Sequence, residues 1–324
     1  MSADGITGVL AEVDEWPVGT VGAAVVTTDV DGPVLHGDAD RLFALASVSK
    51  LITCYGVLIA VEEGAFDLDD TVDDIAAEYG TTVDAPQDVT VRELLSHASG
   101  VGMHSRAQEK PARSRRIYSS AGFDILADLV SSTGIPFFTY VREGLCEPLG
   151  IDVHLSGSAG HGFGARLGDL AVLAAEFLSP TLISEELWDE ALTPQFPELD
   201  GVVPGYGSQR PCPWGLGMEL HGEKSPHWLP DSMPAEVAGH FGQAGTFLWF
   251  HRPTGRAAVV LANRPFGDWA KQRWDGFNDR LWSAFCRRRA PSSLSLPLPG
   301  GPAPSCPPES GRENAASTRG HPGN

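Results

Sequence analysis

The sequence has no long hydrophobic run. Its longest apolar stretch, Leu51 to Val61, has eleven residues and includes Thr53 and Tyr55. A helix that crosses a bilayer needs about 20 apolar residues, so we expect no membrane-spanning segment and no membrane partner. The N-terminus also lacks a basic start followed by a hydrophobic stretch, so the sequence shows no secretion signal.

Basic residues and cysteines are scarce as well. The 324 residues contain 23 Lys and Arg against 42 Asp and Glu, for a net charge of −19 at pH 7. Phosphate contacts need clustered basic residues, so the composition argues against a nucleic-acid partner. The five cysteines are dispersed without a CxxC pair, which without an export signal is typical of reduced thiols and predicts a cytoplasmic protein.

The last 38 residues lack the apolar periodicity of the rest. In residues 287–324, half of the positions are Pro, Gly or Ser. Such a segment cannot bury enough surface to offset its ordering entropy. We therefore predict one domain, residues 1–286, followed by a disordered tail, residues 287–324.

The pattern before the tail predicts an α+β fold, with strands near both ends and helices between them. The turn Asp29-Val-Asp-Gly-Pro, flanked by strands at residues 21–28 and 34–36, predicts a hairpin, and late strands are expected at residues 214–220, 245–251 and 256–263. Expected helices span residues 4–15, 49–63, 90–95, 121–133, 137–146, 167–177, 184–192 and 265–285. We expect an antiparallel sheet flanked by the N- and C-terminal helices, with a mostly helical lobe inserted.

The segment Ser47-Val-Ser-Lys50 could carry chemistry. Residues three apart on a helix share a face, so Lys50 can reach a proton of Ser47, a weak nucleophile alone. About 0.3 such SxxK matches arise by chance in this composition, and a helix cap with an exposed lysine is the structural alternative. The nearly all-apolar helix that follows favours a buried Lys50 with a lowered pKa.

Four segments, in order, resemble the serine β-lactamase and penicillin-binding protein superfamily. The sequence is most similar to class C β-lactamase-like esterases and D-amino-acid-specific peptidases. The segments are Phe43-Ala-Leu-Ala-Ser-Val-Ser-Lys50, Val89-Thr-Val-Arg-Glu-Leu-Leu-Ser-His-Ala-Ser-Gly100, Tyr118-Ser-Ser-Ala-Gly-Phe123 and Gly239-His-Phe-Gly-Gln-Ala-Gly-Thr246. The resemblance covers about residues 5–285 and implies a β-lactamase-like fold.

The resemblance implies a role for each matched residue. Ser47 would be the acylated nucleophile, Lys50 its proton partner, and Tyr118 the tyrosine that assists as general base and protonates the leaving group. From the residues alone, a tyrosine before a small-residue turn and helix, such as Tyr118, is ordinarily core packing, and only the ordered motifs favour a catalytic role. His240 to Gly242 would match the family's edge strand, and the Gln243 backbone N–H would join that of Ser47 as oxyanion hole.

Two residues depart from the family pattern. Ser120 stands where the family usually has Asn, so an amide that contacts the substrate carbonyl is missing. His240 replaces the lysine that β-lactamases place near the substrate carboxylate, so positive charge there depends on pH. Both departures favour a small ester or amide over a β-lactam as substrate.

Other polar residues have structural interpretations. His97 matches a loop-bracing residue, and a metal pair of His97 with His104 lacks a third ligand, so we expect neither metal nor cofactor. The acidic residues between Asp67 and Asp74 fit a solvated helix start. The prediction is an esterase-like serine hydrolase that acts through an acyl-enzyme on a small ester or amide, and its partner is a small-molecule ester, amide or β-lactam substrate. The alternatives are β-lactamase or D-amino-acid peptidase activity, or a non-catalytic ligand-binding module.

Overall fold

The computed structural model describes residues 3–286, in which the largest sheet has six antiparallel strands in the order β2-β1-β11-β10-β9-β8. Its strands are β1 (Val21–Thr27), β2 (Val34–Gly37), β8 (Glu219–Leu220), β9 (Ala238–Gly242), β10 (Thr246–His251) and β11 (Arg256–Ala262). The first strand pairs with the last, with Val21 opposite Ala262. The predicted α+β class is confirmed, whereas the predicted tail, residues 287–324, lies outside the described residues.

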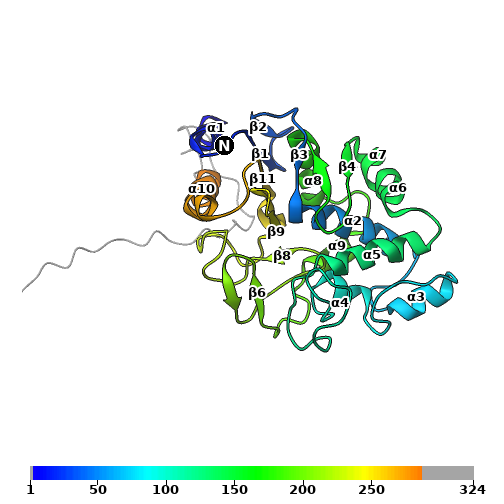
Figure 1. Cartoon of the computed structure of the whole chain (residues 1–324). Coiled ribbons are helices and arrows are strands. Elements are labelled where there is room, and N and C mark those ends of the chain that lie inside the picture. Colours follow the sequence, from blue (N-terminus) through cyan, green and yellow to red (C-terminus); the bar gives the residue numbers. More distant parts are fainter. Residues whose placement is uncertain (1–2, 287–324) are drawn as a thin grey trace, which may run out of the picture.

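Helices cover both faces of this sheet (Figure 1). They are α1 (Ala3–Leu10), α2 (Ser49–Glu62), α3 (Val72–Glu78), α4 (Val91–Leu95), α5 (Ala121–Ser132), α6 (Phe137–Val141), α7 (Glu147–Leu149), α8 (Leu167–Leu178), α9 (Glu185–Leu192) and α10 (Asp268–Cys286). Shorter helical turns are η1 (Ala11–Glu15), η2 (Ala46–Val48), η3 (Arg142–Cys146) and η4 (Arg252–Thr254). The described residues also form two small sheets. One has three strands in the order β3 (Phe43–Ala44), β5 (Phe163–Ala165) and β4 (Val153–Leu155), and the other pairs β6 (Gly201–Val203) with β7 (Gly207–Gln209).

The alternation along β11 divides the core into two clusters. Val259 and Leu261 join the cluster under the helical lobe, whereas Ala258 and Val260 join the cluster with α1 and α10. This two-residue period is what a sheet covered on both faces requires.

Helix α2 runs through the middle of the helical lobe. Every residue from Ser49 to Ala60 is buried, as its nearly uninterrupted apolar sequence predicts. Gly64 follows the helix with φ +72, the left-handed conformation that glycine adopts without strain. Lys50 at the first turn is therefore carried into the interior.

The strand predicted at residues 214–220 is mostly wrong. Only Glu219 and Leu220 form a strand, because Gly217 has φ +78 and turns the chain back toward Trp214. The backbone N–H of Leu216 donates to the carbonyl of Ala191, outside any sheet, at 2.8 Å. The alternating glycines at residues 215 and 217 are thus turn residues, although their spacing imitates a strand.

No helix in the described part of the chain is both long and apolar enough to cross a bilayer. Cys54, Cys146 and Cys212 are buried free thiols.

Candidate active site

Ser47 sits on the tight turn η2, directly before α2. The preceding Ala46 has φ +46, a conformation that costs a non-glycine residue about 1–3 kcal/mol and is typical of functional sites. The turn is fastened to the β9–β10 hairpin, because Thr246 Oγ1 donates to the carbonyl of Leu45 at 2.8 Å. A Cβ on Gly242 would lie 2.3 Å from that same carbonyl oxygen, so only glycine permits this approach.

The side chain of Lys50 is fully buried, which excludes the alternative of an exposed lysine behind a helix cap. Its Nζ donates to Ser120 Oγ at 3.0 Å and to the carbonyl of Gly160 at 2.8 Å. Burial lowers the pKa of Lys50 to about 7, against an opposing effect of the Asp124 charge. A large fraction of Lys50 is therefore neutral near pH 7.

Tyr118 lies beside both residues. Its ring centroid lies 4.7 Å from Lys50 Nζ, and the Ser47 side chain lies near enough to its hydroxyl to lower the pKa of Tyr118. Burial has the larger effect and raises that pKa. Tyr118 is consequently protonated at neutral pH.

The backbone fixes the protonation of His240. Its Nδ1 lies 2.7 Å from the carbonyl oxygen of Phe241, which can only accept, so Nδ1 carries the proton. Burial, followed by the Lys50 charge, lowers the pKa of His240 to about 4, so the ring is neutral and Nε2 is an acceptor. The Tyr118 hydroxyl, 3.3 Å away, therefore donates to His240 Nε2.

These side chains open onto one cavity of about 410 Å³. Its lining combines polar residues with an apolar wall: Ser47, Tyr118, Ser120, His240, Gln243, Met103, Pro204, Trp214 and Phe241. Five of the seven predicted site residues line the cavity. Lys50 does not, but it donates to Ser120, which does. Gly242 does not either, but it lies against the Leu45 carbonyl, at the start of the turn that carries Ser47. The structure thus brings the predicted residues together.

A buried ionic cluster adjoins the cavity at Glu219. Its carboxylate accepts from Lys224 Nζ at 2.8 Å, from His227 Nε2 at 3.0 Å and from Trp228 Nε1 at 2.9 Å. These partners hold the pKa of Glu219 well below its usual range, against burial. Sequence reasoning missed this cluster because its members follow no recognisable spacing.

His97, for which we predicted a loop-bracing role, does not line the cavity. It has φ +59, and its buried Nδ1 accepts from the backbone N–H of Ser119 at 3.1 Å. Burial lowers the pKa of His97 well below its usual value. Within residues 3–286, no three potential ligands among His, Cys, Asp and Glu are placed to hold a metal ion.

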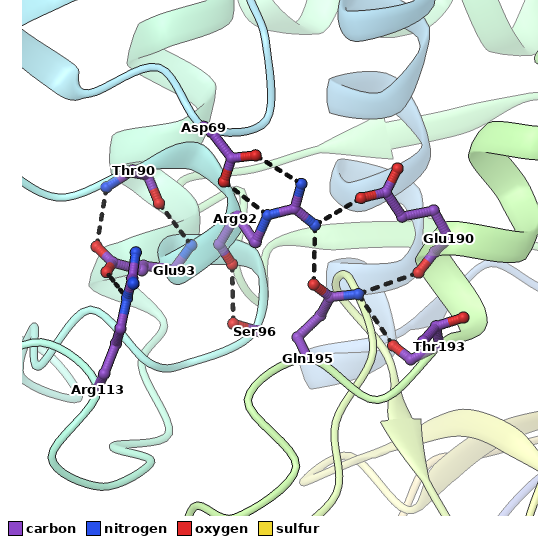
Figure 2. Close-up of polar contacts among 9 residues, drawn as sticks. All are labelled: Asp69, Thr90, Arg92, Glu93, Ser96, Arg113, Glu190, Thr193 and Gln195. Carbon is purple, nitrogen blue, oxygen red and sulfur yellow. Dashed lines mark hydrogen bonds and ion pairs between the residues drawn. The ribbon is translucent and has the colours of Figure 1, made fainter.

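Two arginines, Arg116 and Arg92, join chain segments around the site, and neither role could be predicted from the sequence motifs. The guanidinium of buried Arg116 donates to the carbonyls of Ser96, Gln195, Phe196 and Cys212. Nearer the surface, Arg92 joins α4 to α9 and its neighbouring loop (Figure 2). The acidic stretch does form a helix start, because Thr71 and Asp74 cap α3 reciprocally.

Known proteins are similar to this chain in sequence and in fold. A family model described as Beta-lactamase matches residues 17–159. The solved structure of a β-lactamase from Mycobacterium bovis is 41% identical, with a TM-score of 0.79, over 86% of this chain and 99% of that one. No curated protein sequence matches the chain.

More distant structures share the fold alone. A simvastatin synthase variant from Aspergillus terreus is 16% identical, with a TM-score of 0.70, over 87% of this chain and 98% of that one. An octameric penicillin-binding protein homologue from Pyrococcus abyssi is 17% identical, with a TM-score of 0.62, over 82% and 74%. On the strength of the Mycobacterium relative, the chain belongs to the β-lactamase family of serine hydrolases.

Proposed function

We propose that this protein hydrolyses a small ester through an acyl-enzyme formed on Ser47. The observation that carries the proposal is a serine hydroxyl and a protonated tyrosine that line one cavity, with a buried and largely neutral lysine bonded to the adjoining Ser120. A lysine with a pKa near the working pH is a suitable general base.

In the proposed first step, Ser47 Oγ attacks the ester carbonyl carbon and loses its proton, for which neutral Lys50 is the base. Tyr118 retains its proton at rest, so it acts as a relay: it gives its proton to the leaving alcohol and receives in its place the proton that Lys50 took from Ser47. This modifies the role of standing general base expected for Tyr118. Water then attacks the acyl group and frees Ser47.

Two backbone N–H groups are suited to hold the oxyanion. The carbonyl of Ala46 accepts from Ser49, so the trans peptide directs the Ser47 N–H the opposite way, out of the helix start. The carbonyl of Gly242 accepts from Gly245 at 3.0 Å, which likewise directs the Gln243 N–H away from its turn. Each such donor contributes roughly 10²–10³ in rate in other hydrolases.

The preference for an ester over a β-lactam follows from the two departures. His240 is neutral at pH 7 and offers no positive charge to a substrate carboxylate. Ser120 supplies a hydroxyl that already accepts from Lys50, in place of an amide. The Mycobacterium bovis relative is named a β-lactamase, so β-lactam hydrolysis is the second candidate function.

The first test is Ser47→Ala, assayed with p-nitrophenyl butyrate. We expect turnover to fall by at least about 10³-fold, because the nucleophile is lost, while the melting temperature stays within a few degrees. Ser208→Ala, an exposed serine in β7, is the matched control and should keep full activity. Retention of substantial activity by Ser47→Ala would show that the nucleophile is misassigned.

The second test compares kcat/KM for p-nitrophenyl butyrate and nitrocefin. We expect the ester to be preferred, because the site lacks matched partners for a β-lactam carboxylate and amide. A clear preference for nitrocefin would establish the second candidate instead. Failure of a fluorescent phosphonate to label Ser47 would favour a non-catalytic binding module.

A further inference from the structure

We propose that Asp124 is a positioning residue for Lys50, acting through the loop of residues 156–162 that joins β4 to β5. The inference rests on the proposed function, because it concerns the lysine assigned there as the base. Asp124 does not touch Lys50; it holds the loop whose Gly160 carbonyl accepts from the lysine.

The direction of the Lys50 ammonium is set from outside its own helix. Its two hydrogen-bond acceptors, Ser120 Oγ and the Gly160 carbonyl, belong to α5 and to the 156–162 loop. A shift of that loop therefore moves one of the two acceptors away from Nζ. Misplacement of a catalytic group by about 1 Å can reduce the rate about 10²-fold.

Asp124 fixes this loop by two short contacts to a single carboxylate oxygen. Oδ1 accepts from Ser158 Oγ at 2.7 Å and from the backbone N–H of Ala159 at 2.9 Å. Ser158 Oγ in turn accepts from the backbone N–H of Gly160 at 3.0 Å. A continuous chain of hydrogen bonds thus links the carboxylate to the residue that receives Lys50.

The 156–162 loop is also held against α2 and against the start of α5. Thr53 Oγ1 in α2 donates to the carbonyl of Ala159 at 2.7 Å. A Cβ on Gly160 would lie 2.9 Å from the carbonyl oxygen of Ser120, so the loop backbone lies directly on the start of α5. Ser120 and Asp124 are four residues apart, so one face of α5 supplies both the direct and the indirect contact to Lys50.

The carboxylate also acts through its charge. The Asp124 charge raises the pKa of Lys50 against the effect of burial. The other titratable groups around Lys50 are Tyr118, which is protonated, and His97 and His240, whose lowered pKa values keep them neutral. Asp124 itself shares a second cavity of about 420 Å³ with Arg106 and Asp128, which pair with each other at 2.6 Å.

The test separates position from charge by three variants, using kcat/KM for p-nitrophenyl butyrate across pH. Asp124→Asn keeps an acceptor oxygen but loses the charge, so we expect a modest loss and an acidic limb displaced to lower pH. Ser158→Ala keeps the charge but breaks the link to Gly160, so we expect a lower kcat/KM with an unmoved limb. Asp124→Ala loses both and should fall by about 10²-fold.

Asp128→Asn is the matched control, because it removes a neighbouring carboxylate on the same helix whose bond is to Arg106 and not to the loop. It should leave both the rate and the acidic limb unchanged. If Asp124→Ala fails to fold, Asp124→Asn and Ser158→Ala still decide. A Ser158→Ala variant with the wild-type kcat/KM, or an Asp124→Asn profile displaced no further than that of Asp128→Asn, overturns the proposal.

Phosphonate labelling distinguishes this failure from failure of the proposed function. If wild-type protein is not labelled on Ser47, the hydrolase assignment is wrong and the inference falls with it. If Ser47 is labelled and the Asp124 and Ser158 variants keep the wild-type rate and pH profile, only the positioning role of Asp124 is wrong.

Discussion

The two cations Lys50 and Arg92 show how differently one fold can treat a positive charge. Arg92 bonds the carboxylates of Asp69 and Glu190 at 2.7 Å, and its hydrogen bonds with Asp69 raise its pKa (Figure 2). Lys50 is fully buried, bonds a hydroxyl and a carbonyl, and has a pKa of about 7.

The difference lies in whether a carboxylate bonds the cation directly. For Arg92 the carboxylates are direct partners, and they stabilise the charged form. For Lys50 the carboxylate of Asp124 acts from behind the 156–162 loop, so burial has the larger effect and the neutral form becomes available. Arg92 therefore stays charged and joins two helices, whereas Lys50 can give up and take up a proton near pH 7.

The largest expected effect is on catalysis. Lys50→Met should lower kcat/KM for p-nitrophenyl butyrate by about 10²–10⁴-fold, because the proposed general base is lost. Arg92→Met, the matched removal of a cation outside the cavity, should change it by less than about threefold. Comparable losses in the two variants would mean that Lys50 has only a structural role.

The second expected effect is on the free energy of unfolding. Here Lys50→Met, the more damaging variant for catalysis, should be the more stable of the two. Lys50→Met should raise the free energy of unfolding by about 2 kcal/mol at pH 7, because a buried ammonium without a carboxylate partner is costly. Arg92→Met should lower it by about 1 kcal/mol, since its partners are partly exposed. Urea denaturation of both variants measures the difference.

The pH dependence gives the sign of the Lys50 contribution. The pKa of Lys50 is about 7 in the folded protein against 10.5 for the ordinary side chain, so between these values only the unfolded chain binds the proton. Wild-type stability therefore gains about 2 kcal/mol from this group between pH 7 and 9. The advantage of Lys50→Met should shrink by that amount, and a constant advantage would contradict the lowered pKa.

The smallest effect concerns salt. Raising NaCl from 0.05 to 1 M should reduce the cost of Arg92→Met by less than about 0.5 kcal/mol, because Asp69 and Glu190 are partly exposed and screened. The acidic limb of the wild-type pH profile should stay in place, because Lys50 is shielded from ions. A displaced limb would show that solvent reaches the lysine.

Much of the fold and the direct contacts of the site could be predicted from sequence. The four ordered segments predicted the fold, and the apolar helix after Ser47 predicted the burial of Lys50. The Trp214 to Leu220 strand was wrong because glycine turns and strands can share a two-residue spacing.

The positions of distant acceptors could not be predicted. Gly160 contacts Lys50 through a backbone carbonyl, which any residue type would supply, so no motif marks it. Asp124 directly follows the Tyr118 segment in sequence. Its partners Ser158 and Ala159 lie in the loop between β4 and β5, and nothing in the sequence shows that this loop packs on α5. Sequence patterns thus identify side chains that react, but not the backbone that holds them.

The pairing of β1 with β11 has a consequence for biosynthesis. Val21 leaves the ribosome early, but Ala262, its partner in the sheet, is made 241 residues later. The hydrogen bond between Tyr118 and His240 spans 122 residues in the same way. The nascent chain must therefore keep β1 unpaired on that side until β11 has been made, and the cavity closes only after β9 has emerged.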